Sequence, residues 1–319
     1  MTTRREMILG TIAGGILMHT RSLYAKAAQP STPVDFDVPP GACDCHTHIH
    51  GDPALFPFFA GRVYTPEPAS PEEMAELHKF LHMQRVVIVT PSVYGTNNAS
   101  TLFGMKARGK DARGVAVIDD RTTEKELDAM NEAGVRGIRI NLATSGIADP
   151  AVARKRLAAA ADRLRNRGSW HIQIYADLPV IAAIKDDLAA CAPTLVFDHF
   201  AGADAALGTQ QPGFNDLLGL VKSGKAYVKI SGAYRASKLA PDYPDVTPLA
   251  QALIAANAER IIWGTDWPHP NSTPSDISKV TPLYQIDDGR LLNRLPVWAP
   301  DAEVRKKILV DNPVRLYQF

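Results

Sequence analysis

The stretch Asp44-Cys45-His46-Thr47-His48 lies in the first of eight short apolar segments of the chain. On an extended segment successive side chains point to opposite faces, so His46 and His48 are expected to lie on one side together with Asp44. Two imidazoles one residue apart can act as adjacent metal ligands or as adjacent donors to a developing oxyanion. The structural alternative is a pair of hydrogen-bonded histidines at a strand end, and this short motif alone does not exclude it.

Eight apolar segments alternate with helical patterns along the rest of the chain. The predicted strands span residues 42–49, 86–91, 114–119, 135–142, 171–177, 194–200, 226–232 and 260–267. Most are continuous runs of β-branched and apolar residues, which is typical of strands covered on both faces. Helix starts lie between them, for example at Ser70-Pro71-Glu72-Glu73, where a capping serine precedes a proline and two acids. A further helix is predicted from Leu178 to about residue 190.

This alternation predicts a single (β/α)8 TIM barrel of α/β class over residues 41–319. An open doubly wound sheet is the alternative, but no Gly-x-Gly-x-x-Gly motif follows any strand. We therefore expect functional residues at the carboxyl ends of the strands, where barrel enzymes place their chemistry. Residues 268–300, which are rich in loops, are expected to cap the mouth of the barrel.

The composition excludes several classes of function. The chain has 319 residues, of which 45% are apolar, and a formal net charge of +1. This near-neutral charge predicts neither nucleic acid nor an anionic membrane surface as a partner. Three cysteines form no disulfide framework in a chain of this length. Cys43 and Cys45 lack the second pair that a cysteine zinc site would need, and we interpret them as small buried hydrophobes.

The first 27 residues differ from the rest of the chain. Arg4-Arg5 precede an apolar run at 7–18, and Ala25-Lys26-Ala27 places small residues where a signal peptidase cleaves. This pattern predicts an export signal of twin-arginine type and a periplasmic location. A hydrophobic helix that stays attached as an anchor is the alternative. Residues 28–40 are interpreted as a linker.

Polar side chains gather where the other strands are predicted to end. Asp266 lies between two Trp-containing apolar stretches, where an unpaired buried carboxylate would be costly, so burial alone does not explain it. A helix cap or salt bridge is its structural alternative. The other polar residues at strand ends are Ser92, Arg139, Asn141, Tyr175, Asp198, His199, Tyr234 and Arg235.

Three motifs together resemble the amidohydrolase superfamily. They are Cys-His-Thr-His at 45–48, Asp-His at 198–199 and Trp-Gly-Thr-Asp-Trp-Pro-His-Pro-Asn at 263–271. From Gly41 onward the chain most resembles the lactonase branch that includes the 2-pyrone-4,6-dicarboxylate hydrolases. The resemblance implies a hydrolase that opens a carboxylate-bearing lactone of pyrone or sugar-acid type. It also implies that Asp266 activates water and that His46, His48 and His199 polarise the lactone carbonyl.

The same resemblance implies a set of substrate-binding residues, namely Tyr64, Ser92, Arg139, Tyr175 and Arg235. The chain departs from the pattern at Ser145, where the pyrone hydrolases carry an arginine for a second carboxylate. A serine cannot pair with a carboxylate charge. A dicarboxylated pyrone is therefore disfavoured, whereas a lactone with one acid group remains compatible.

A metal cofactor is not expected. Metal-bearing relatives add a histidine at the end of the fifth strand, but here His171 stands at the start of that strand. A single divalent metal such as zinc, held by His46, His48 and Asp266, is the alternative. Lys229, within the seventh strand, is expected to form a structural charge pair.

Two other functions remain open from the sequence. A lactone isomerase could use the same base and carbonyl-polarising set to move an acyl group to a neighbouring hydroxyl. A non-catalytic exported binding barrel is the third possibility, although Asp266 and the histidines are all present.

Overall fold

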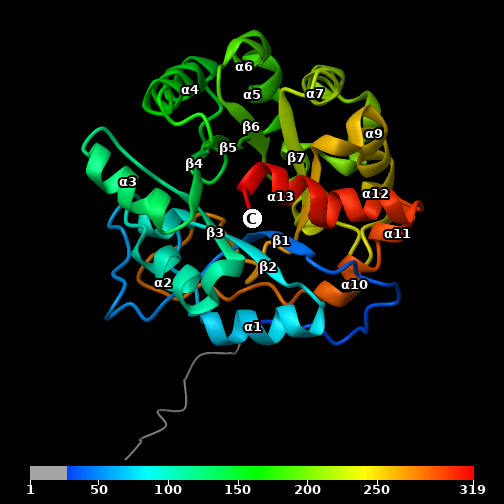
Figure 1. Ribbon diagram of the computed structural model, residues 1–319, viewed down its shortest axis with the longest axis horizontal. Helices are drawn as coiled ribbons and strands as arrows, with labels where there is room; N and C mark the ends of the chain where they lie inside the picture. The colour runs from blue at the N-terminus through cyan, green and yellow to red at the C-terminus, as the bar shows by residue number, and fades with distance from the viewer. Residues whose placement is uncertain (1–26) are drawn as a thin grey trace, which may run out of the picture.

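The computed structural model describes residues 27–319 and shows a barrel of eight parallel strands in chain order (Figure 1). The strands are β1 (Cys43–Thr47), β2 (Arg85–Val89), β3 (Ala112–Ala116), β4 (Val135–Asn141), β5 (His171–Tyr175), β6 (Thr194–Phe197), β7 (Ala226–Ser231) and β8 (Ile261–Gly264). Every predicted strand is present, with its ends shifted by a few residues. The predicted TIM barrel is confirmed.

The barrel closes where β1 and β8 meet. Thr47 and Trp267 form a parallel bridge, and His48 N donates to Trp267 O at 2.8 Å. Asp266 N donates to His46 O at 2.9 Å. These backbone bonds place Asp266, which follows the last strand, beside the two histidines that end the first.

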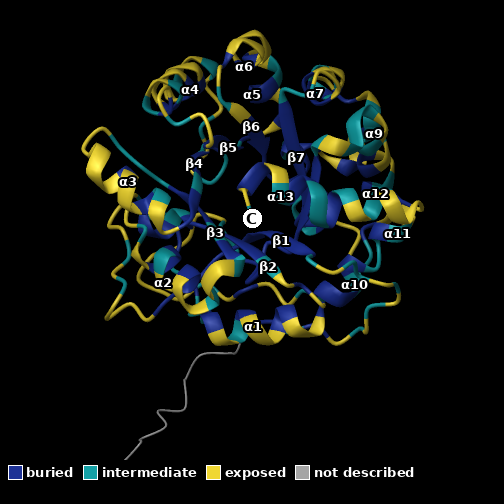
Figure 2. Ribbon diagram, in the orientation of Figure 1, coloured by how far each residue is buried: buried dark blue, intermediate teal, exposed yellow. Residues whose placement is uncertain are grey.

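Helices surround the strands, with buried faces toward the barrel and exposed faces toward solvent (Figure 2). The longer ones are α1 (Pro71–Phe80), α2 (Ala99–Arg108), α3 (Glu124–Glu132), α4 (Pro150–Arg163), α7 (Phe214–Lys222) and α9 (Thr247–Asn257). Shorter ones are α8 (Ala233–Ala236), α10 (Asp288–Leu292), α11 (Leu295–Trp298) and α12 (Ala302–Lys306). Ser70 caps the start of α1, as the sequence predicts, and it forms a capping box with Glu73.

The helix predicted from Leu178 to about residue 190 is two helices, α5 (Leu178–Ala183) and α6 (Lys185–Ala190). The chain leaves the helical conformation at Ile184, with φ −118° and ψ 20°. Ile184 is buried whereas the three residues after it are exposed, so the bend keeps this side chain in the core.

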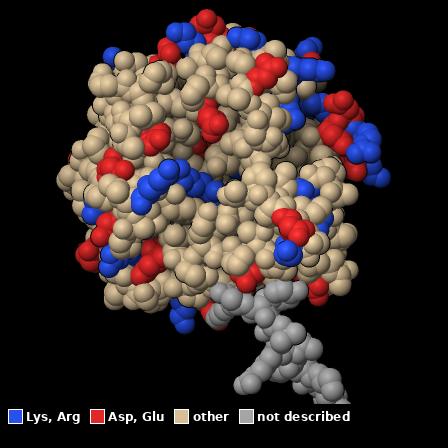
Figure 3. Space-filling model, turned by 180° about the vertical axis from the view of Figure 1, so that it is seen from behind, with Lys and Arg blue, Asp and Glu red and all other residues tan. Residues whose placement is uncertain are grey.

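Helix α13 (Asn312–Tyr317) closes the end of the barrel at which the strands begin (Figure 1). Tyr317 packs there with Cys43 and Cys45 in one buried cluster, so the two cysteines are small core residues as expected. Because this end is filled, access to the barrel is from the carboxyl ends of the strands. Figure 3 shows that opposite face, which is hollowed near its centre.

The segment that follows the predicted signal lies against the barrel. Trp267 Nε1 donates to Ala28 O at 3.0 Å, and the Ser31 and Thr32 hydroxyls donate to Asp287 at 2.8 and 2.7 Å. The predicted export signal falls almost wholly outside the described residues. Within residues 27–319, no helix is long and apolar enough to span a membrane.

Candidate active site

A small pocket, called the reaction pocket below, lies at the carboxyl ends of the strands. The sequence predicts nine site residues, and eight of them line the reaction pocket. These eight are His48, Tyr64, Ser92, Arg139, Tyr175, His199, Arg235 and Asp266. His46, the ninth, is fully buried and adjoins this group. Two wider cavities of about 510 and 580 Å³ flank the reaction pocket and share Thr144 with it.

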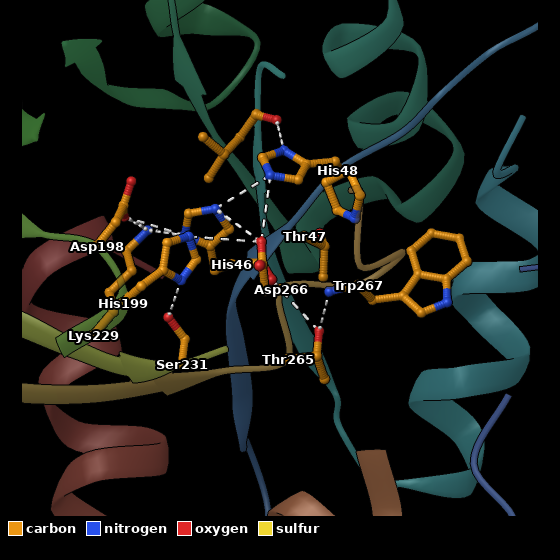
Figure 4. Close-up of polar contacts among 12 residues, drawn as sticks. His46, Thr47, His48, Asp198, His199, Lys229, Ser231, Thr265, Asp266 and Trp267 are labelled. Carbon is orange, nitrogen blue, oxygen red and sulfur yellow. Dashed lines mark hydrogen bonds and ion pairs between the residues drawn. The ribbon is translucent and has the colours of Figure 1, made fainter. Parts of the chain in front are cut away.

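Three imidazoles converge on one carboxylate oxygen (Figure 4). Asp266 Oδ1 lies 3.7 Å from His46 Nε2, 3.6 Å from His48 Nε2 and 3.7 Å from His199 Nε2. His46 Nε2 and His48 Nε2 are 3.3 Å apart. No described residue forms a hydrogen bond with Asp266 Oδ1, so this oxygen faces the pocket free to accept a proton.

The other oxygen of Asp266 is held firmly. Tyr234 Oη donates to Asp266 Oδ2 at 2.6 Å, and Arg235 Nε donates to the same atom. Burial alone would raise the pKa of Asp266, but the Arg235 charge and the neighbouring histidines hold that pKa well below its usual range. The carboxylate is therefore ionised and oriented. From the sequence, Arg235 was predicted to bind substrate, and Tyr234 was named at a strand end without a role.

The backbone at the site is strained at two of these residues. Asp266 has φ 68° and His199 has φ 49°, both in the left-handed region that residues other than glycine rarely adopt. Such conformations cost about 1–3 kcal/mol each and persist where surrounding contacts fix them. At Asp266 the contacts are the backbone bond to His46 and the two bonds to Oδ2.

Two of the histidines have defined partners on the side away from the pocket. His48 Nδ1 lies 2.7 Å from Val89 O, and a carbonyl only accepts, so Nδ1 carries the proton. His199 Nδ1 lies 3.0 Å from Ser231 Oγ. Burial lowers the pKa of His199 to about 4, and the Asp266 charge only partly opposes this, so His199 is neutral at physiological pH.

A buried group of charges lies beneath the reaction pocket. Asp198 Oδ2 accepts from Arg139 Nε at 3.1 Å and from Gln173 Nε2 at 3.0 Å. Asp198 Oδ1 lies 3.2 Å from His46 Nδ1 and 3.4 Å from Lys229 Nζ. Burial lowers the pKa of Lys229, and the Asp198 charge opposes that shift. Lys229 thus forms the structural charge pair that the sequence predicts. The sequence assigned no role to Asp198 or Gln173, because strand parity alone does not show which polar residues share the barrel interior.

Asp44 does not lie with the histidines, contrary to the expectation from strand alternation. Its Oδ2 accepts from Thr265 Oγ1 at 2.6 Å and lies 3.2 Å from His78 Nε2 of helix α1. The pairing of β1 with β2 shifts register between Asp44 and Thr47, which interrupts the alternation of side chains. Asp44 therefore faces the helix layer while His46 faces the barrel interior.

The ligand atoms of His46, His199 and Asp266 lie within 4.8 Å of one another, so these residues could hold a metal ion. Two imidazole nitrogens and a carboxylate oxygen suit zinc, and Asp266 Oδ1 lacks a hydrogen-bond partner among the described residues. The sequence named His48 in place of His199. His48 Nε2 is also close, at 3.6 Å from Asp266 Oδ1.

Residues 43–319 match the family model described as amidohydrolase. The chain belongs to the amidohydrolase family. Within this family it is 33% identical over 299 residues to 2-pyrone-4,6-dicarboxylate hydrolase of Comamonas testosteroni, covering 91% of this chain and 94% of the relative. It is 31% identical over 310 residues to D-galactarolactone isomerase of Agrobacterium fabrum, covering 94% and 96%.

A solved structure of an Agrobacterium tumefaciens protein in its apo form is also similar to this amidohydrolase. It superposes with a TM-score of 0.78 at 27% identity, covering 91% of this chain and 98% of the other. The family resemblance and the expectation of a hydrolytic enzyme are thus confirmed. The roles of individual side chains stay predictions.

Proposed function

We propose that this amidohydrolase opens a lactone that bears a carboxylate, by adding water to the lactone carbonyl. The observation that carries the proposal is the free Oδ1 atom of Asp266, held ionised and facing three imidazoles. The similarity to 2-pyrone-4,6-dicarboxylate hydrolase supports the choice of a lactone as substrate.

In the proposed reaction Asp266 Oδ1 takes a proton from water as the water oxygen attacks the carbonyl carbon. The carbonyl oxygen becomes an oxyanion beside the imidazole Nε2 atoms, which stabilise it where they carry a proton. The bond from the carbonyl carbon to the ring oxygen then breaks. The ring oxygen takes the proton back from Asp266, and the product is a hydroxy acid.

Arg139 is the proposed anchor for the substrate carboxylate. Its Nε and Nη2 both contact Asp198 Oδ2 at 3.1 Å, and no described residue accepts a hydrogen bond from Nη1. This leaves one edge of a fixed guanidinium for an anion. Its guanidinium lies 5.5 Å from the ring centre of Tyr175. Tyr64, Ser92 and Arg235 complete the proposed substrate-binding set.

We propose that the reaction needs no metal. If a divalent ion such as zinc is present, His46, His199 and Asp266 would hold it, with His48 nearby. Bound there, the ion would supply polarisation of the carbonyl oxygen and acidify water.

Lactone isomerisation is the second candidate, and the similarity to D-galactarolactone isomerase favours it. In that reaction Asp266 would deprotonate a hydroxyl of the substrate instead of water. Turnover of carboxylate-bearing lactones in ¹⁸O-labelled water, followed by NMR and mass spectrometry, separates the two. Hydrolysis gives an open acid with one labelled oxygen, whereas isomerisation gives a rearranged ring without label. Absence of turnover across pyrone and sugar-acid lactones would contradict the proposal.

We further propose that the enzyme is exported to the periplasm, on the strength of Arg4-Arg5 and Ala25-Lys26-Ala27. Fractionation and N-terminal sequencing should find a mature chain that begins at Ala28. Full-length chain found only in the cytoplasm would contradict this.

A further inference from the structure

Lys229 is a fully buried cation inside the barrel, close to His46 and remote from solvent (Figure 4). An ammonium group has three N–H donors and no acceptor. Three atoms with lone pairs surround the ammonium group of Lys229. Gln173 Oε1 lies at 2.7 Å, His46 Nδ1 at 3.2 Å and Asp198 Oδ1 at 3.4 Å. Lys229 therefore has hydrogen-bond partners in Gln173 Oε1 and His46 Nδ1, while Asp198 Oδ1 pairs with its charge without accepting a hydrogen bond.

An imidazole nitrogen that accepts a hydrogen bond carries no proton. A neutral imidazole with an unprotonated Nδ1 carries its proton on Nε2. We infer that Lys229 holds His46 in the tautomer with the proton on Nε2, so that His46 presents a fixed N–H donor to the reaction pocket. Lys229 is thus a positioning residue that acts through His46.

The contact between the two strand-one histidines supports this assignment independently. His48 carries its proton on Nδ1, because Val89 O can only accept, so a neutral His48 has a lone pair on Nε2. His46 Nε2 lies 3.3 Å from that atom. With the proton of His46 on Nε2, the free enzyme has an N–H facing this lone pair, and two lone pairs do not meet at this distance.

The opposite tautomer would have His46 Nδ1 donate to Asp198 Oδ1, 3.2 Å away. Two lone pairs would then face each other between His46 and His48. Asp198 Oδ1 also forms no hydrogen bond with any described residue, although it lies 3.2 Å from His46 Nδ1. The geometry favours donation from Lys229.

The inference has a chemical consequence. An Nε2–H can stabilise an oxyanion but cannot ligate a metal, which needs the lone pair of that atom. Lys229 therefore selects the donor role of His46 over the ligand role. This kinetic consequence rests on the proposed function, whereas the tautomer itself does not.

The tautomer can be read directly by long-range ¹H–¹⁵N NMR of histidine-labelled protein, with assignments from His46→Gln and His48→Gln variants. We expect an Nε2–H pattern for His46 and an Nδ1–H pattern for His48. In Lys229→Met, His46 should change to Nδ1–H, since Asp198 then remains as its partner. His48 should keep its pattern and serves as the internal control. An Nδ1–H pattern for His46 in the unmodified enzyme would overturn the inference, and that spectrum decides it even if the variant fails to fold. A folded Lys229→Met variant in which the His46 pattern is unchanged would also overturn the inference.

The kinetic arm uses a lactone on which turnover has been demonstrated. Lys229→Met should lower kcat about 10²-fold with little change in KM, as for loss of one oxyanion donor. Lys225→Met is the matched control, because Lys225 lies before the start of β7 and contacts Cys191 O, away from the pocket. It should retain full activity. A changed tautomer with unchanged kcat would overturn the donor role of His46, and failure to find any substrate would leave the NMR result standing.

Discussion

Arg235 and Asp266 form a buried ion pair in which Arg235 Nε donates to Asp266 Oδ2 and leaves Oδ1 open to the reaction pocket. The Asp266 side chain is fully buried and that of Arg235 is 14% exposed. From the sequence, Asp266 was predicted to activate water and Arg235 to bind substrate. Their pairing links the orientation of the proposed base to a residue expected to bind substrate.

Arg235→Met should destabilise the fold by about 3–5 kcal/mol, because it leaves a buried carboxylate without its cation. In an Asp266→Asn background the same change should cost much less, since no charge remains to be paired. Urea unfolding of the four proteins measures this coupling. Arg290→Met is the control, because Arg290 pairs with Asp242 at the surface, and it should cost about 1 kcal/mol or less. Additive effects of Arg235→Met and Asp266→Asn would show that the pair contributes no coupling.

Arg139→Ala should raise KM for a carboxylate-bearing lactone by tens-fold or more. Removing one partner of a buried, hydrogen-bonded charge pair costs about 2–5 kcal/mol. A neutral lactone of similar size serves as the control, and its KM should change much less. Equal losses on both substrates would mean that Arg139 serves the barrel through Asp198 and does not bind the acid group.

We predict that activity survives dialysis against a chelator, because no metal takes part in the proposed reaction. The prediction follows from the fixed donor role inferred for His46. Elemental analysis of the purified enzyme, together with rates before and after chelation, provides the measurement. Stoichiometric zinc, with activity lost on its removal and restored on its return, would refute it and would favour the metal site that His46, His199 and Asp266 could form.

We predict that His171 makes the free energy of unfolding depend on pH. Burial lowers its pKa in the folded state to about 3, from an ordinary value of about 6.5. Below the ordinary value the unfolded chain binds a proton that the folded chain does not, so stability falls as pH drops from about 6.5 toward 3. Between pH 7 and 4.5, the free energy of unfolding should fall by roughly 2–3 kcal/mol less in His171→Phe than in the unmodified protein.

Urea unfolding at both pH values measures this effect. His82→Asn changes an exposed histidine and should leave the pH dependence as it is. An unchanged slope in His171→Phe would show that His171 does not contribute to it.

The barrel was predictable because each strand is a nearly continuous apolar run, and the reaction pocket because polar residues follow those runs. What the sequence could not show are contacts that depend on register and on bends. Asp44 turned to the helix layer at a register shift, and Ile184 divides a helix that periodicity alone joins. Lys229 forms the charge pair that the sequence predicts, but only the folded barrel shows that its ammonium also lies beside His46.

Asp266→Asn tests the central claim most directly. The amide keeps the size of the side chain and the bond that Tyr234 donates, but it cannot accept the proton of the attacking water. On a lactone with demonstrated turnover, kcat should fall by roughly 10²–10⁴-fold while substrate still binds, since general-base catalysis contributes about that much. Near-unchanged kcat in a folded Asp266→Asn enzyme would contradict the mechanism and make Asp266 a structural partner of Arg235.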